Sequence, residues 1–126
     1  MADPKKVLIV DDEPHILRSL GFVVQRAGYE VLEARGGQQA LDMIAEHRPH
    51  LVFLDIMMPE LDGYEVCRRV KASSDLRGTY VIMLTAKGQQ DDYEEGVEAG
   101  ADEYMTKPFS PSRAVERVEA VLGSPE

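Results

Sequence analysis

The chain has 126 residues and a formal net charge of −9 at pH 7, with 44% of its residues hydrophobic and 29% charged. This length suits one domain, and we expect residues 1–126 to form it, with a core from about 5 to 122 and a tail or linker start at 123–126. The acidic balance excludes nonspecific attraction of this domain to nucleic acid or to a membrane surface. A cytoplasmic location is favoured, because the sequence has a single cysteine, no apolar run of ~20 residues and no signal-peptide core.

The predicted elements alternate between strands and helices along the whole chain. The apolar runs Val7–Val10 and Leu51–Leu54 predict strands buried on both faces, which are typical of parallel sheets covered by helices. Further strands are predicted at 30–34, 80–85 and 103–105, and helices at 14–27, 37–48, 91–99 and 111–122, with one more helix carrying Val66, Cys67 and Val70. Five such βα units predict a doubly wound α/β fold with right-handed crossovers.

Proline, glycine and serine mark several of the predicted boundaries. Pro14 fits the first turn of the first helix, and Gly28 stops that helix. Ser110 is predicted to cap the last helix, with Pro111 at its first position. Gly63 closes the turn-rich segment 59–63, where we expect it to adopt a positive φ.

Polar residues stand at the predicted C-terminal ends of four strands. Asp11 and Asp12 follow the first strand, Asp55 ends the third, Thr85 ends the fourth, and Lys107 follows the fifth. The carboxyl ends of parallel strands form one edge, where ligands of open α/β sheets bind. Two like charges about 5 Å apart repel by roughly 3 kcal/mol at an effective dielectric constant near 20. If the strands that carry them are neighbours in the sheet, the three carboxylates converge and need compensation at this edge.

Lys107 offsets one of these charges, and a hard divalent cation would offset the others. Carboxylate oxygens with no histidine or cysteine at zinc spacing favour Mg²⁺ (or Mn²⁺). Carboxylates, a cation, a hydroxyl and a lysine together suit phosphoryl transfer, in which a carboxylate can itself be the nucleophile and form an acyl phosphate.

These motifs, in this order, resemble the receiver domain of two-component response regulators, the CheY-like family. The resemblance runs from about Lys5 to Leu122 and rests on Asp11-Asp12-Glu13, Asp55-Ile56-Met57-Met58-Pro59, Asp62-Gly63, Thr85-Ala86 and Lys107-Pro108-Phe109. It implies a flavodoxin-like sheet of strand order 2-1-3-4-5. It also implies a signalling switch that catalyses its own phosphorylation and dephosphorylation, and not an enzyme acting on a separate substrate.

The resemblance assigns the acceptor and the metal ligands. Asp55 would be phosphorylated by a sensor histidine kinase or a histidine phosphotransfer protein, and by small donors such as acetyl phosphate. Asp12, Asp55 and the backbone carbonyl of Met57 would bind the magnesium ion, and Asp11 would act mainly through water. Our hypothesis is that the bulky, apolar Met57 side chain also shields the acyl phosphate from attack by water.

The resemblance also assigns a switch. Lys107 would pair with the phosphoryl group, and its bond to Pro108 would be cis. Thr85 would turn its hydroxyl toward a phosphoryl oxygen, beside the small Ala86, and Tyr104 would swing into the space that Thr85 vacates. The changed face, formed by helix 4, strand 5 and helix 5, would then act on a downstream effector domain or protein.

Other functions fit the sequence less well. Dehalogenase-like phosphatases need a second Asp two positions after the nucleophile, where this chain has Met57. Nucleotide-binding and flavin-binding domains hold phosphate in a glycine-rich loop after the first strand, but residues 11–15 contain no glycine and are acidic. The remaining alternative is a receiver-like scaffold that binds partners without phosphorylation, although this chain lacks none of the expected acids nor the lysine.

Receivers of the OmpR/PhoB type dimerise through the helix 4, strand 5 and helix 5 face with a characteristic set of charged residues. Asp102 and Arg117 match this set, whereas Tyr93 stands where a basic residue is expected and Arg113 where an acidic one is expected. We therefore expect a monomer or a weak dimer.

Overall fold

The computed structural model describes residues 4–58, 61–86 and 97–123. Its strands are β1 (Lys6–Val10), β2 (Glu30–Ala34), β3 (Leu51–Asp55), β4 (Tyr80–Ala86) and β5 (Glu103–Lys107). Its helices are α1 (Pro14–Arg26), α2 (Gly37–His47), α3 (Gly63–Ala72) and α5 (Pro111–Leu122). Of the helix predicted at 91–99, residues 97–99 are helical and the remainder lies outside the described residues.

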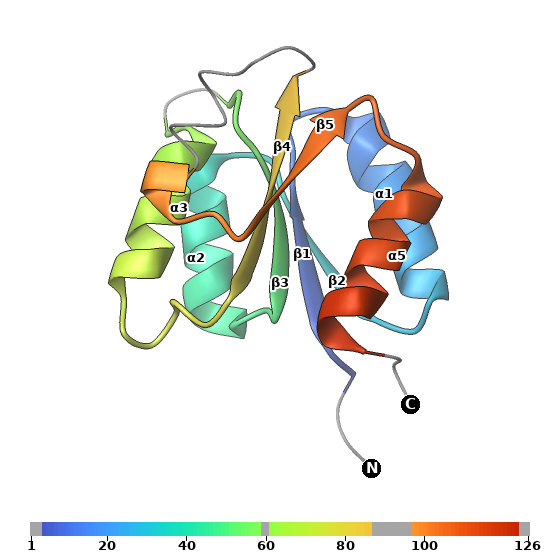
Figure 1. The fold of residues 1–126 in the computed structure, drawn as a ribbon, viewed down its shortest axis with the longest axis horizontal. Helices are drawn as coiled ribbons and strands as arrows, with labels where there is room; N and C mark the ends of the chain where they lie inside the picture. Colours follow the sequence, from blue (N-terminus) through green and yellow to red (C-terminus); the bar gives the residue numbers. More distant parts are fainter. Residues whose placement is uncertain (1–3, 59–60, 87–96, 124–126) are drawn as a thin grey trace.

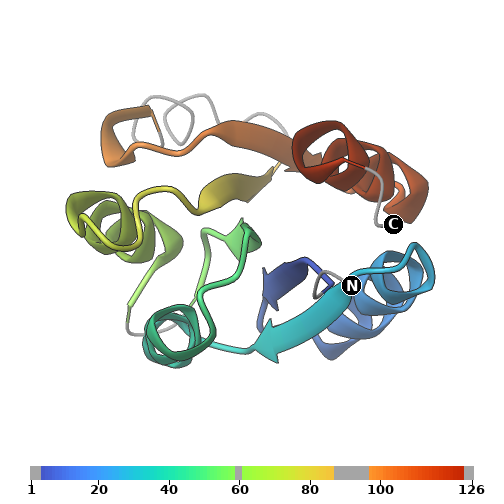
Figure 2. The same cartoon turned by 90° about the horizontal axis from the view of Figure 1, so that it is seen from below.

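The strands form one parallel sheet in the order β2-β1-β3-β4-β5, as predicted. Helices α1 and α5 cover one face of the sheet, and α2 and α3 cover the other (Figures 1 and 2). This three-layer arrangement buries both faces of the central strands, because the connecting helices α1, α2 and α3, together with α5, pack on the sheet. All five residues of β3 are buried as a result.

Alternate residues of each central strand enter two separate cores. Val7 and Ile9 of β1 pack with the buried side chains of α1 and α5, whereas Leu8 and Val10 pack with those of α2 and α3. This follows from the two-residue period of a strand, which sends successive side chains to opposite faces. The sheet is therefore anchored from both sides.

The helix boundaries follow the predicted signals, with one exception. Ser110 caps α5 by accepting a hydrogen bond from the Arg113 N–H at 3.2 Å, and Gly28, at φ 105°, follows the end of α1. The prediction of a positive φ at Gly63 was wrong, because Gly63 is the first residue of α3 and has no left-handed conformation. A Cβ atom there would lie 2.5 Å from the Asp55 carbonyl oxygen, so the glycine permits close packing against the end of β3.

Among the described residues, none of the helices combines the length and the apolar character that a membrane crossing requires.

Candidate functional site

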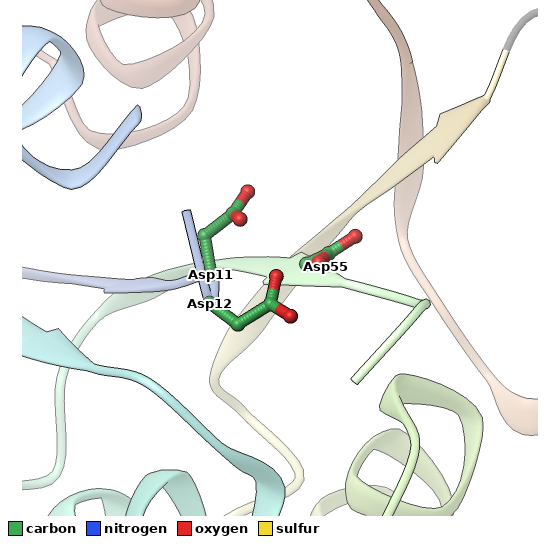
Figure 3. Close-up of side chains that lie close together, drawn as sticks. All are labelled: Asp11, Asp12 and Asp55. Atoms are coloured by element: carbon green, nitrogen blue, oxygen red, sulfur yellow. The ribbon is translucent and has the colours of Figure 1, made fainter. Parts of the chain in front are cut away.

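Three carboxylates meet where β1 and β3 end side by side. Val10 pairs with Leu54 in the sheet, so Asp11 and Asp12 follow one strand where Asp55 closes its neighbour. One carboxylate oxygen from each of the three residues lies within 4.8 Å of the others (Figure 3). Asp11 is fully buried and Asp55 is 4% exposed, whereas Asp12 is exposed to solvent. The predicted convergence of these acids is therefore present.

Lys107 reaches this cluster from β5, which extends to residue 107 and so includes the lysine at its end. Its Nζ lies 2.8 Å from Asp11 Oδ2 and 3.5 Å from Asp55 Oδ1. Partial burial lowers the pKa of Lys107, but the neighbouring Asp11 and Asp55 outweigh that effect and hold its pKa above the usual value. The lysine is therefore charged at neutral pH. The Lys107–Pro108 bond is cis, as the family resemblance implied.

Asp55 is difficult to ionise in this position. Burial, followed by the charge of Asp11, raises its pKa to about 6, although Lys107 and the Met57 N–H partly oppose the shift. The Met57 N–H donates to Asp55 Oδ1 at 3.3 Å. At neutral pH the Asp55 carboxylate is thus ionised at a cost in free energy.

The two oxygens of Asp11 are placed differently. Oδ1 accepts a hydrogen bond from the Glu13 N–H at 2.9 Å. Oδ2 is buried and forms an ion pair with the Lys107 ammonium at 2.8 Å. Because Asp11 faces the lysine and Asp12 faces solvent, Asp12 is the more accessible of the two as a direct ligand.

This donor set fits a hard divalent cation. It offers oxygen atoms only, from three acids that a single lysine does not neutralise. Mg²⁺ uses one or two carboxylates, with waters completing an octahedron. The cluster therefore can bind a metal ion, and its chemistry matches magnesium better than zinc.

The loop after Asp55 is held by Ile56, a residue that the sequence reasoning did not single out. The Ile56 N–H donates to the Leu84 carbonyl at 3.4 Å, and the Ile56 carbonyl accepts from the N–H groups of Met58 and Gly63, both at 3.1 Å. These bonds tie the start of the loop to β4 and α3. Nothing in the sequence signals this role, because any residue supplies the same backbone groups.

Thr85 and Tyr104 lie on the neighbouring strands β4 and β5. Thr85 is buried, pairs with Thr106 of β5 and is the last residue but one of β4. Tyr104 is half-buried and packs against the core formed with α2 and α3. The structure thus brings Thr85 to the same end of the sheet as the acids, and it places Tyr104 opposite Met83, two residues earlier along β4.

Comparison with known proteins identifies the family. Residues 7–119 match the model of the response regulator receiver domain. The chain belongs to this family. It is similar to the phosphate regulon transcriptional regulatory protein PhoB of Pseudomonas aeruginosa, with 47% identity over 94% of this chain and 52% of that protein. It is also similar to the alkaline phosphatase synthesis transcriptional regulatory protein PhoP of Bacillus subtilis, with 44% identity over 94% of this chain and 48% of that protein.

Comparison with solved structures agrees with this family assignment. The solved structure of the chemotaxis protein CheY4 of Vibrio cholerae superposes with a TM-score of 0.88 at 32% identity and covers 94% of this chain and 99% of its own. The present receiver domain therefore has a CheY-like fold, and it spans about half the length of the curated relatives that it matches.

The residues expected at a dimer face have partners within the receiver domain. Asp102 Oδ2 accepts from Lys71 Nζ at 2.7 Å and from the Val81 N–H at 2.8 Å. Arg117 forms a bidentate ion pair with Glu103, in which Nε donates to Oε2 at 2.5 Å and Nη2 donates to Oε1 at 2.7 Å. Tyr93 lies outside the described residues.

Proposed function

We propose that this receiver domain accepts a phosphoryl group on Asp55 in a magnesium-dependent reaction and thereby switches the face that contains β5 and α5. One observation carries the proposal: the three carboxylates and Lys107 lie together at one end of the sheet, with the pKa of Asp55 raised to about 6. Strongly perturbed carboxyl groups in a cluster are a mark of functional sites.

In the proposed reaction, an oxygen of the Asp55 carboxylate attacks the phosphorus atom of the donor. The new O–P bond forms as the P–N bond of a phosphohistidine, or the P–O bond of acetyl phosphate, breaks, and the leaving group keeps the electron pair. A carboxylate with a raised pKa is a better nucleophile than an ordinary one, yet it remains mostly ionised at pH 7.

The other residues of the cluster would hold the metal ion and neutralise the negative charge of the phosphoryl group. Asp12 and Asp55, with the Met57 carbonyl, would hold the ion directly, and Asp11 would act through water. When bound there, Mg²⁺ (or Mn²⁺) supplies positive charge that neutralises the phosphoryl oxygens. Lys107, which already lies 3.5 Å from Asp55 Oδ1, would pair with the transferred group.

The switch and the partners follow from the same site. Thr85 would donate its hydroxyl to a phosphoryl oxygen, and Tyr104 would move in response, so that phosphorylation shifts the balance between two states of the β5 and α5 face. The donor would be a sensor histidine kinase or a histidine phosphotransfer protein. The receiver would act on a downstream effector domain or protein without binding nucleic acid itself, and as a monomer or weak dimer. Sedimentation with beryllofluoride tests the last point, and a tight dimer would contradict it.

Acetyl phosphate with Mg²⁺, followed by intact-mass measurement, tests the proposed function. We expect a gain of one phosphoryl group that disappears in Asp55→Asn, after chelation of the metal, and in Asp12→Asn at low Mg²⁺. Asp75→Asn is the matched control, because Asp75 is exposed in the turn after α3, away from the cluster. If the wild-type protein gains no phosphoryl group from any donor, the scaffold that acts without phosphorylation is the better explanation.

A further inference from the structure

Met57 differs from the other described methionines in its contact with solvent. Its exposed fraction is 73%, whereas Met58 is 8%, Met83 0% and Met105 5% exposed. Met43 packs partly buried against the core beneath α2. A thioether is oxidised only when the oxidant reaches its sulfur, so accessibility sets the order of reaction among methionines. Among the described residues, Met57 is therefore the methionine with the sulfur most open to attack.

The backbone fixes Met57 beside the carboxylate cluster. Its N–H donates to Asp55 Oδ1 at 3.3 Å. The residue before it, Ile56, is hydrogen-bonded to Leu84 on β4 and to Gly63 at the start of α3. The Met57 side chain thus starts from a held position next to Asp55, and a chemical change on it acts close to that carboxyl group.

We propose that Met57 is an oxidation site for hydroperoxides, and that its oxidation shortens the lifetime of the phosphoryl group on Asp55; the second part rests on the function proposed above. The sulfur of Met57 attacks one peroxide oxygen, an S–O bond forms and the O–O bond breaks. The product is the sulfoxide, and hydrogen peroxide is reduced to water, or an alkyl hydroperoxide to the alcohol. Sulfur loses two electrons, which the peroxide gains.

The consequence follows from the change in polarity. The thioether side chain is apolar and exposed to solvent, whereas a sulfoxide oxygen is a strong hydrogen-bond acceptor. An acyl phosphate on Asp55 is lost by attack of water. An acceptor beside it binds and orients a water molecule there, which the apolar thioether does not do. One additional hydrogen bond to the attacking water corresponds to about fivefold faster hydrolysis.

Limited treatment with hydrogen peroxide and peptide mapping test the first part. Met58 is the internal comparison, because it has the same chemistry one residue later but is buried. We expect one oxygen atom to appear on Met57 at least about tenfold faster than on Met58, as expected of a reaction limited by access to the sulfur. Equal rates at the two residues in the folded protein would overturn this part, whatever the phosphorylation results.

The second part is tested by loading oxidised and unoxidised protein with acetyl phosphate, removing the donor and following loss of the phosphoryl group by intact mass. We expect the lifetime to fall about fivefold after oxidation. Each variant is compared with itself before and after peroxide: Met58→Leu should keep the response and Met57→Leu should lose it. Met57→Gln, which carries a permanent acceptor, should have a short lifetime that peroxide does not change.

The outcomes separate this inference from the function on which it rests. If the unoxidised protein takes up a phosphoryl group but oxidised Met57 leaves its lifetime unchanged, the inference is wrong and the proposed function stands. If the unoxidised protein takes up none, the proposed function fails and the effect on lifetime fails with it, while the peptide map still decides whether Met57 is the peroxide-sensitive residue.

Discussion

Replacing Asp55 by asparagine should stabilise the folded domain at neutral pH, although it removes the proposed phosphorylation site. Burial and the neighbouring Asp11 raise the pKa of Asp55 from 3.8 to about 6. A carboxyl with a raised folded-state pKa binds its proton more tightly in the folded than in the unfolded state. The favourable contribution of the protonated Asp55 carboxyl to the free energy of unfolding is therefore complete below pH about 4 and is lost as the pH rises through about 6.

The size of the effect follows from the shift. About 2 pKa units correspond to roughly 3 kcal/mol, at about 1.4 kcal/mol for each unit. Water reaches the cluster from the side of the exposed Asp12, which reduces the penalty for the ionised form. We therefore expect Asp55→Asn to raise the free energy of unfolding by about 1–3 kcal/mol at pH 7.5 in the absence of divalent metal, and by close to zero at pH 4.

Urea denaturation of both proteins across this pH range, with the metal chelated, measures the difference. Mg²⁺ at neutral pH should stabilise the wild type more than Asp55→Asn, because the ion offsets the repulsion that the substitution has already relieved. Asp75→Asn, in an exposed turn, should change stability little at any pH. A gain in Asp55→Asn that is the same at pH 4 and pH 7.5, or no gain at all, would refute the electrostatic reasoning.

Three further predictions concern the rest of the domain. Gly63→Ala should destabilise the fold by about 2 kcal/mol or more, because the new Cβ would lie 2.5 Å from the Asp55 carbonyl oxygen. Gly78→Ala should leave stability unchanged, because the space around its new Cβ is open, and thermal unfolding compares the two variants. Arg117→Gln should cost about 1–2 kcal/mol at pH 7. That cost should shrink as the pH falls below 4.5 and vanish once Glu103 is protonated, because the hydrogen bond from Arg117 lowers the pKa of Glu103 and the stabilisation is lost as the pH falls through that pKa. An undiminished cost in urea melts carried into increasingly acid solution would contradict this. Cys67, whose burial raises its pKa to about 11, should resist thiol reagents at pH 8 until the protein is unfolded, and rapid labelling of the native protein would disprove its burial.

The sequence by itself determined the architecture and the composition of the site. Apolar runs such as Leu51–Leu54 can be buried only between two layers of helices, so the alternation of strands and helices leads to a parallel sheet. Parallel strands end at one edge, and the strand order implied by the family resemblance makes the strands that carry Asp11, Asp12 and Asp55 neighbours at that edge. These conclusions depend on local pattern and on topology, which a sequence carries directly.

Distances and exposures were decided only by the tertiary structure. Lys107 lies nearer to Asp11 than to Asp55, although in the strand order β3 is closer than β1 to β5. Gly63 is required by the close approach of two backbones and not by its own φ. Met57 and Met58 are the same residue type at adjacent positions, yet the Met57 side chain faces solvent and the Met58 side chain is buried in the core. Each of these outcomes depends on what residues distant in sequence place nearby, which a local pattern cannot encode.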